Sequence, residues 1–340
     1  EKIILDGKSK TVTYEHARFE LFGRPIAYLP WFRHADPNTK RKTGLLTPEV
    51  GYSDELGVWY RQPYFIATGD SHDLTLKATG FTRQGVLADA EWRHQLESGL
   101  YSFRAVGIQQ LDRNRFDSPP DTTVKNRGLI ATNGSFNINP RWSFGWDVLV
   151  TSDATFPVTY EIDRFNVSSF TNQAYLQGLH DKSFFRLAAQ KYEIQGTNYL
   201  VENQQAKLLP VLDYNYVKTG DYTGGEVSLD VNVTNTDRSQ LSVVTPLSGD
   251  TRTHGTSGDS ARASADLGWK KTLTTAGGLM LTPSLAVRGD WANVNAISGV
   301  GSELVSNGDA FRFMPTAALE ARYPLLFQSA TSSHIVEPIA

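Results

Sequence analysis

The strongest constraint in this sequence is a two-residue alternation of apolar and polar side chains that begins near Leu45. Two clear examples are Val227, Leu229, Val231 and Val233, and Ala263, Ala265, Leu267 and Trp269, each set separated by polar or small residues. A period of two places the apolar side chains on one face of a β-strand. No helical pattern of ten residues or more occurs, so we predict an all-β chain.

The connections between the predicted strands alternate in length. The short connections are residues 68–71, 96–99, 139–141, 180–183 and 219–223, and the long ones are residues 111–123, 151–167, 196–204, 236–259 and 293–308. Two tight connections, residues 54–56 and 82–84, depart from this alternation. Antiparallel strands that cross a bilayer have tight turns on one side and long loops on the other. A soluble β-sandwich has no reason to sort its loops in this way.

Composition excludes several classes of protein. The net charge of −3 gives no electrostatic footprint for nucleic acid. The absence of cysteine from these 340 residues excludes disulfides, cysteine-ligated metals and thiol nucleophiles here. Mean hydropathy is −0.34, and no apolar run reaches the roughly 20 residues of a spanning helix. A membrane role would therefore require a β-barrel.

The search for catalytic motifs is negative. The sequence has no Gly-x-Ser-x-Gly, His-Glu-x-x-His, P-loop or EF-hand motif. Asp89 and Glu91 share one face of a predicted strand, so an acid/base pair is conceivable. Such residues in barrels usually face the lumen, and we expect no enzymatic activity, no cofactor and no metal.

The N-terminal residues differ from the rest of the chain. Short strands are predicted at Lys2–Leu5, Thr11–Tyr14, Phe19–Phe22 and Ile26–Phe32, followed by a polar linker. We expect residues 1–40 to end one domain and residues 41–340 to begin another. The first residues lack a signal-peptide pattern and the last resemble the start of a strand, so we expect a piece truncated at both ends.

Several segments resemble the LptD (OstA/Imp) family of outer-membrane lipopolysaccharide-assembly proteins. The resemblance is carried by residues 21–32, 41–48 and 62–65, and further on by residues 323–326 and 334–338. The family motif at the expected domain junction comprises Gly23, Pro25, Tyr28, Pro30, Gly44 and Leu46.

The resemblance implies the end of a periplasmic β-jellyroll followed by the N-terminal part of a large antiparallel transmembrane β-barrel of about 26 strands. It places the protein in the outer membrane of a Gram-negative bacterium, with the N-terminal part in the periplasm. The implied substrate is lipopolysaccharide, inserted into the outer leaflet through a lateral gate between the first and last barrel strands. The implied partners are an LptE-like lipoprotein plug, an LptA-like periplasmic bridge and outer-membrane lipids.

Pro48 and Pro63 fall in the first two predicted barrel strands. Proline lacks an N–H and removes a ladder bond, and in lipid an unmade backbone bond is costly. The two positions match the family's gate prolines, so the resemblance favours a weakened seam where the first strand meets the last. The alternative is that Pro48 merely begins a strand and Pro63 lies at a sheet edge.

A basic patch, Lys40, Arg41 and Lys42, precedes the first barrel strand. These side chains could contact lipopolysaccharide phosphates, and a solvated linker is an equally good interpretation. Two other functions stay open for the whole chain. One is a porin or solute transporter of the outer membrane, and the other is a soluble protein that binds or cleaves carbohydrate.

Overall fold

The computed structural model describes residues 2–6, 11–21, 24–35, 41–220, 224–244, 252–296 and 307–340. The chain divides into two compact units. The first comprises residues 1–136, 147–170 and 195–199, and the second comprises residues 137–146, 171–194 and 200–340. Each unit is described separately below.

The first unit begins with a small antiparallel sheet of β1 (Lys2–Asp6), β2 (Thr11–Leu21) and β3 (Arg24–Ala35). Our prediction of two separate strands at Thr11–Tyr14 and Phe19–Phe22 is wrong, since β2 runs through both. His16, at the middle of β2, has a left-handed φ of 57°. This local distortion lies where the alternation of side chains in the sequence is interrupted.

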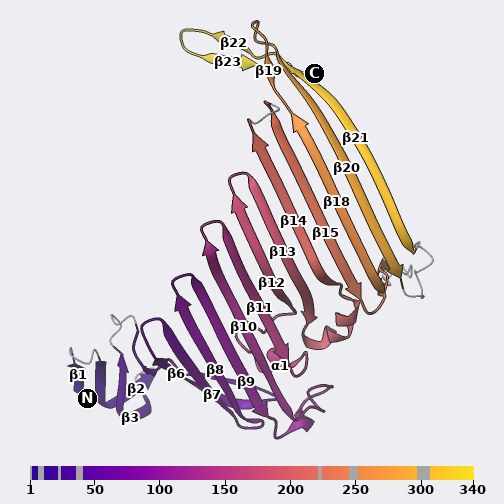
Figure 1. Cartoon of the computed structure of the whole chain (residues 1–340). Helices are drawn as coiled ribbons and strands as arrows, with labels where there is room; N and C mark the ends of the chain where they lie inside the picture. Colours follow the sequence, from indigo (N-terminus) through magenta and orange to yellow (C-terminus); the bar gives the residue numbers. More distant parts are fainter. Residues whose placement is uncertain are drawn as a thin grey trace. The chain divides into compact units, whose positions relative to one another are not determined.

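The remaining strands of the first unit pair in chain order (Figure 1). They are β4 (Gly44–Leu45) and β5 (Glu49–Ser53), which both pair with β6 (Gly57–Ala67), followed by β7 (His72–Phe81), β8 (Gly85–Leu96), β9 (Gly99–Gln109) and β10 (Asn126–Asn139). A 3₁₀ turn, η1 (Arg113–Arg115), lies in the connection after β9, and a short helix, α1 (Phe156–Thr159), follows β11 (Trp142–Thr151). The strand pairs from β4 to β10 are antiparallel.

The second unit also pairs its long strands antiparallel, in the order β13-β14-β15-β18-β20-β21. Its elements are β12 (Ser169–His180), β13 (Ser183–Ile194), η2 (Gly196–Gln204), β14 (Lys207–Thr219), β15 (Glu226–Arg238), β18 (Gly258–Lys270), β19 (Leu273–Thr274), β20 (Met280–Ala296) and β21 (Gly308–Arg322). Two small ribbons complete it, β16 (Ser242–Val244) with β17 (Arg252–Gly255), and β22 (Leu325–Gln328) with β23 (Ser333–Val336).

The predicted all-β class and the antiparallel pairing are confirmed. Tight turns separate β6 from β7, β8 from β9, β10 from β11 and β12 from β13, at or within one residue of the predicted positions. The long connections follow β9, β11, β13, β15 and β20, as predicted. Among the described residues, no helix combines the length and apolar content needed to cross a lipid bilayer.

The hydrophobic core of the first unit lies on one face of β7–β11. It combines strand residues such as Leu87, Ile108 and Leu149 with residues of three connections, above all the segment 152–168. The opposite face of the same strands leaves large apolar side chains exposed, including Val86, Phe103, Ile130 and Val150. One face of these strands is therefore buried, and the other exposes apolar side chains. The candidate site is described for each face in turn.

Candidate functional site

The first strand pair of the large sheet is interrupted at Pro48. Residues 46–48 have no strand geometry and separate β4 from β5, so Pro48 immediately precedes β5. Pro63 is buried inside β6, which pairs with β4 and β5 on one side and with β7 on the other. Pro63 is thus not in an edge strand. Pro48 lies within the gap in the ladder, and Pro63 lies opposite it.

The family-motif residues lie in several elements. Gly44 belongs to β4 and Leu46 to the gap after it, where Leu46 is 46% exposed. Pro25, Tyr28 and Pro30 belong to β3, and Gly23 is outside the described residues. The Tyr28 hydroxyl lies 2.6 Å from His16 Nδ1, the residue that distorts β2. The expected role of this motif at a domain junction stays a prediction.

The basic patch is only partly described, because Lys40 lies outside the described residues. Arg41 donates to the carbonyl of Asp70, to that of His72 at 2.8 Å and to the Asp73 carboxylate at 3.2 Å. Arg41 therefore ties its segment to the turn between β6 and β7. The Lys42 Nζ is inaccessible to solvent and has no hydrogen-bond partner among the described residues.

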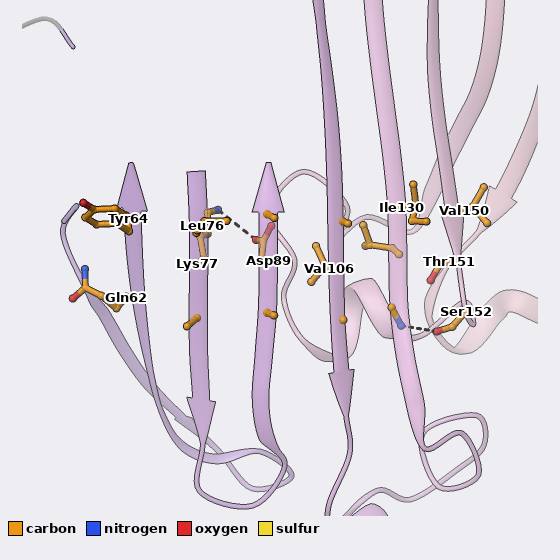
Figure 2. A pocket seen from close by; sticks show the side chains of 17 residues that line it. Gln62, Tyr64, Leu76, Lys77, Asp89, Val106, Ile130, Val150, Thr151 and Ser152 are labelled. Carbon is orange, nitrogen blue, oxygen red and sulfur yellow. Dashed lines mark hydrogen bonds and ion pairs between the residues drawn. The ribbon is translucent and has the colours of Figure 1, made fainter. Parts of the chain in front are cut away.

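The exposed apolar face of the first unit carries a shallow depression of about 840 Å³. Its floor is made of the small residues Ala78, Ala88, Ala90, Ala105, Gly107 and Gly128. Tyr64 and Leu76 flank it on one side, and Ile130 and Val150 on the other (Figure 2). An apolar surface this large and open is unusual for a protein that faces water.

The opposite face carries a charged network. The Arg104 guanidinium binds the Asp89 carboxylate through two nitrogens, at 2.9 and 2.7 Å, and both side chains are buried. Lys77 lies 3.9 Å from Asp89 and donates to the Asp163 carboxylate at 2.9 Å. Arg104 also donates to the Asp163 carbonyl at 2.9 Å. Asp89 is therefore neutralised by two cations, which favours a structural role over acid/base chemistry.

Residues 152–168, which we call the inner loop, cover this charged face. Asp153 holds the start of helix α1 by accepting from the backbone N–H groups of Thr155 at 3.2 Å and Phe156 at 2.9 Å. Phe156 and Phe165 are fully buried, and Tyr160 is 1% exposed. Burial of three aromatic side chains anchors the loop, each contributing roughly 2–3 kcal/mol.

Arg127 of β10 is the second anchor of the inner loop. Its fully buried guanidinium donates to the Asp153 carboxylate at 2.9 Å, to the Thr155 hydroxyl at 2.7 Å and to the Asp121 carboxylate. The Thr159 hydroxyl donates to Asp121 at 2.7 Å. The guanidinium therefore joins a strand, the inner loop and the connection after β9.

Three groups of the inner loop have shifted pKa values. Burial raises the pKa of the Asp153 carboxyl, but the hydrogen bond and charge of Arg127 outweigh burial and leave that pKa below its ordinary value. In Asp163, Lys77 likewise outweighs burial and lowers the pKa. Burial raises the pKa of Tyr160 to about 12. The loop is therefore docked with both carboxyls ionised and the phenol neutral.

The polar face of the second unit is built around Asp290 of β20. The Ser264 hydroxyl donates to its carboxylate at 2.6 Å and Arg312 Nε at 2.8 Å. Arg288 donates from 3.2 Å, and Arg262 lies 3.6 Å away. The arginines come from three strands, and Arg262 and Arg312 remain more than half exposed. Within the described residues, no group of three or more His, Cys, Asp or Glu could hold a metal.

Sequence reasoning missed the inner loop and its two arginine anchors. We predicted residues 151–167 as a long connection and left its contacts open. One feature of the sequence indicates a buried loop, since the loop contains the large apolar residues Phe156, Tyr160, Ile162 and Phe165.

Comparisons with known proteins agree with the resemblance described above. A family model described as LptD, LPS transport system D, matches residues 125–340. The LPS-assembly protein LptD of Xylella fastidiosa (strain Temecula1) is 29% identical over 213 residues, which are 58% of this chain and 25% of the relative. LptD of Haemophilus influenzae (strain 86-028NP) is 27% identical over 208 residues, 60% of this chain and 25% of that protein.

LptD of Idiomarina loihiensis is 28% identical over 226 residues, which are 63% of this chain and 27% of the relative. The matched region thus spans about a quarter of the length of each of these curated relatives.

Proposed function

Because this chain belongs to the LptD family of LPS (lipopolysaccharide) transport proteins, we propose that it forms part of an outer-membrane translocon. This translocon inserts lipopolysaccharide into the outer leaflet through a lateral gate between its first and last barrel strands. The observation that carries the proposal is the inverted environment of the strands. Apolar side chains such as Val86 and Ile130 are more than half exposed, while Arg104 and Arg127 are buried on the other face.

In water this arrangement would be unfavourable, because it exposes apolar surface and desolvates charge. In a bilayer the apolar face contacts hydrocarbon, and the polar face lines an interior. The antiparallel ladder satisfies the backbone groups between neighbouring strands, as hydrocarbon requires. Residues 41–340 are accordingly the N-terminal portion of the barrel, and residues 1–40 end a periplasmic jellyroll.

The gate lies where the first barrel strand is weakest. The ladder between β4–β5 and β6 is interrupted at residues 46–48, and Pro63 opposite this gap has no N–H. Acyl chains of lipopolysaccharide leave between the first barrel strand and the last, where this interruption weakens the hold on the first strand, while its sugars pass along the polar interior. The exposed depression beside Tyr64 is continuous with this region of the wall (Figure 2).

The basic patch contacts the phosphates of the substrate on the periplasmic side. Lys42 would join this contact only after its segment opens, because its ammonium is inaccessible to solvent and has no hydrogen-bond partner among the described residues. Arg41 contributes chiefly by fixing the segment to the β6–β7 turn. An LptE-like lipoprotein occupies the lumen and an LptA-like bridge delivers substrate to the N-terminal domain. No covalent bond is broken and no cofactor takes part.

The test restores the backbone N–H groups that Pro48 and Pro63 lack. Pro48→Ala combined with Pro63→Ala, made in the full-length natural protein, should strengthen the first strand pair and slow surface delivery of pulse-labelled lipopolysaccharide several-fold. The matched control is Pro283→Ala combined with Pro315→Ala, which changes two prolines of the neighbouring strands β20 and β21. Unchanged delivery in the seam variant, or an equal delay in the control, would refute the gate. Solute conductance without any lipopolysaccharide defect would instead support a porin.

A further inference from the structure

The gap opposite Pro63 leaves one backbone acceptor without its ladder donor. Gly44 pairs with Phe65 and Leu45 with Tyr64, so Leu46 lies opposite Pro63. Leu46 N donates to the Pro63 carbonyl at 3.0 Å, which makes these two residues a hydrogen-bonded pair. In such an antiparallel pair the second bond would run from the opposite N–H to the Leu46 carbonyl. Pro63 has no N–H to supply it.

The side chain of Gln62 occupies the place of this missing donor. Its Nε2 donates to the Leu46 carbonyl at 3.0 Å and to the Pro63 carbonyl at 2.9 Å. The Tyr60 hydroxyl donates to Gln62 Oε1 at 2.7 Å. This fixes the orientation of the amide, since the reverse orientation would place Oε1 against two carbonyl oxygens. The Leu46 and Pro63 carbonyls, the Gln62 amide and the Tyr60 hydroxyl therefore all have hydrogen-bond partners.

The position of Gln62 on the strand explains why the hydrogen bond from its side chain to the Leu46 carbonyl matters. Tyr60, Gln62 and Tyr64 alternate along β6 and share the exposed apolar face, where Gln62 and Tyr64 border the depression of Figure 2. An unsatisfied carbonyl on a face that contacts hydrocarbon is costly, because no water replaces the missing bond. A polar side chain on such a face is also unfavourable unless its own groups are paired.

We propose that Gln62 is a positioning residue beside the gate, which replaces the backbone donor that Pro63 lacks and sets how firmly the first barrel strand is held to the second. A side-chain donor can rotate away, whereas a backbone N–H cannot leave without moving the strand. The bond that Gln62 makes is therefore releasable, and Tyr60 holds it in the closed arrangement. The consequence for lipopolysaccharide passage rests on the proposed function, but the replacement of the missing backbone donor by Gln62 does not.

The test is a double-mutant cycle between Gln62 and Pro63 in the purified full-length protein. Gln62→Leu keeps the approximate size of the side chain and removes the donor. Amide hydrogen exchange across residues 44–48 should therefore become about fivefold faster, which is the factor that corresponds to the loss of one net hydrogen bond. In a Pro63→Ala background the new backbone N–H at position 63 serves the Leu46 carbonyl, so Gln62→Leu should leave exchange unchanged. Equal acceleration in both backgrounds, or none in either, would overturn the proposal.

Two further variants separate hydrogen bonding from packing. Gln62→Asn keeps the amide but is one methylene shorter, so it should exchange as fast as Gln62→Leu. Tyr60→Phe removes only the hydroxyl that orients the amide and should accelerate exchange less, by about twofold. Wild-type exchange in Gln62→Asn would contradict the geometric argument. Heat-modified electrophoresis shows whether each variant is folded before exchange is measured.

Export is measured separately in cells. Gln62→Leu should loosen the seam and make the outer membrane more permeable to large antibiotics, and adding Pro63→Ala should reverse this. If the exchange cycle behaves as expected and permeability does not change, the ladder repair stands and the gate at this seam fails. If exchange does not depend on the residue at position 63, the role of Gln62 fails whatever happens to export.

Discussion

The two units treat the charges on their polar faces differently. In the first unit the inner loop covers the charges, and Arg104 and Arg127 are 6% and 3% exposed. Each bonds to the loop as well as to carboxylates, as Arg104 does to Asp163 and Arg127 to Asp153. In the second unit, Arg262 and Arg312 reach Asp290 from the neighbouring strands β18 and β21 and remain more than half exposed.

This difference shows what covering a charged face requires. Removing a guanidinium from water is costly unless its donors find acceptors, so the inner loop must present carboxylates and carbonyls at the right places. Its Asp153 and Asp163 do so, and its aromatic residues bury the apolar part of the same face. Arg262 and Arg312 retain access to solvent, so each of their ion pairs with Asp290 contributes less than a fully buried pair. The same strand pattern thus supports a closed region and an open one.

The largest expected effect comes from removing the covered guanidinium. Arg127→Met leaves Asp121 and Asp153 buried without their cation, which should lower the free energy of unfolding by about 3–5 kcal/mol and release the inner loop. Arg312→Met, its counterpart on the open face, should cost less than about 1 kcal/mol. Urea unfolding of both variants in detergent measures the two effects. Equal losses would show that the two faces do not differ in the way described.

A second prediction concerns the exposed apolar face that each unit has. Ala317 and Thr316 are neighbours on β21, with Ala317 on the apolar face and Thr316 on the polar one. Both are exposed. Ala317→Arg should cost about 2–4 kcal/mol if that face contacts hydrocarbon, whereas Thr316→Arg should change stability by less than about 0.5 kcal/mol.

The measurement is urea-dependent folding of each arginine variant into lipid vesicles. Water on both faces would make the two substitutions equally mild, and that result would remove the membrane interpretation of the exposed apolar residues.

The fold could be predicted further from the sequence than the candidate site. The period of two and the alternating loop lengths depend on local side-chain order, so the tight turns after β6, β8, β10 and β12 are predicted to within one residue. The inner loop depends on contacts between Phe156 or Phe165 and strands many residues away, and the pairing of Arg104 with Asp89 depends on register. Local periodicity contains neither. The role of Gln62 was equally hidden, because it follows from the registration of Leu46 with Pro63.

The smallest effect is expected from pH across the neutral range, although the inner loop is held by ionised groups. Asp153 and Asp163 have pKa values below their ordinary values, so their contribution is complete above about pH 4 and is lost as the pH falls through the lowered values. Tyr160, with its pKa raised to about 12, contributes below about pH 10 and loses its contribution between about pH 10 and 12.

Docking of the loop should therefore be constant from about pH 5 to 9. A spin label at Asn166→Cys can report it, because Asn166 is exposed and the chain has no other cysteine. Its mobility should rise only at acid pH below about 4 and again above about 10. The same label in Arg127→Met should be mobile at every pH, because the cation that keeps Asp153 ionised and docked is gone. A release midpoint near pH 6–7 would contradict the assignment, since it would require a histidine to hold the loop in place of Asp153 and Asp163.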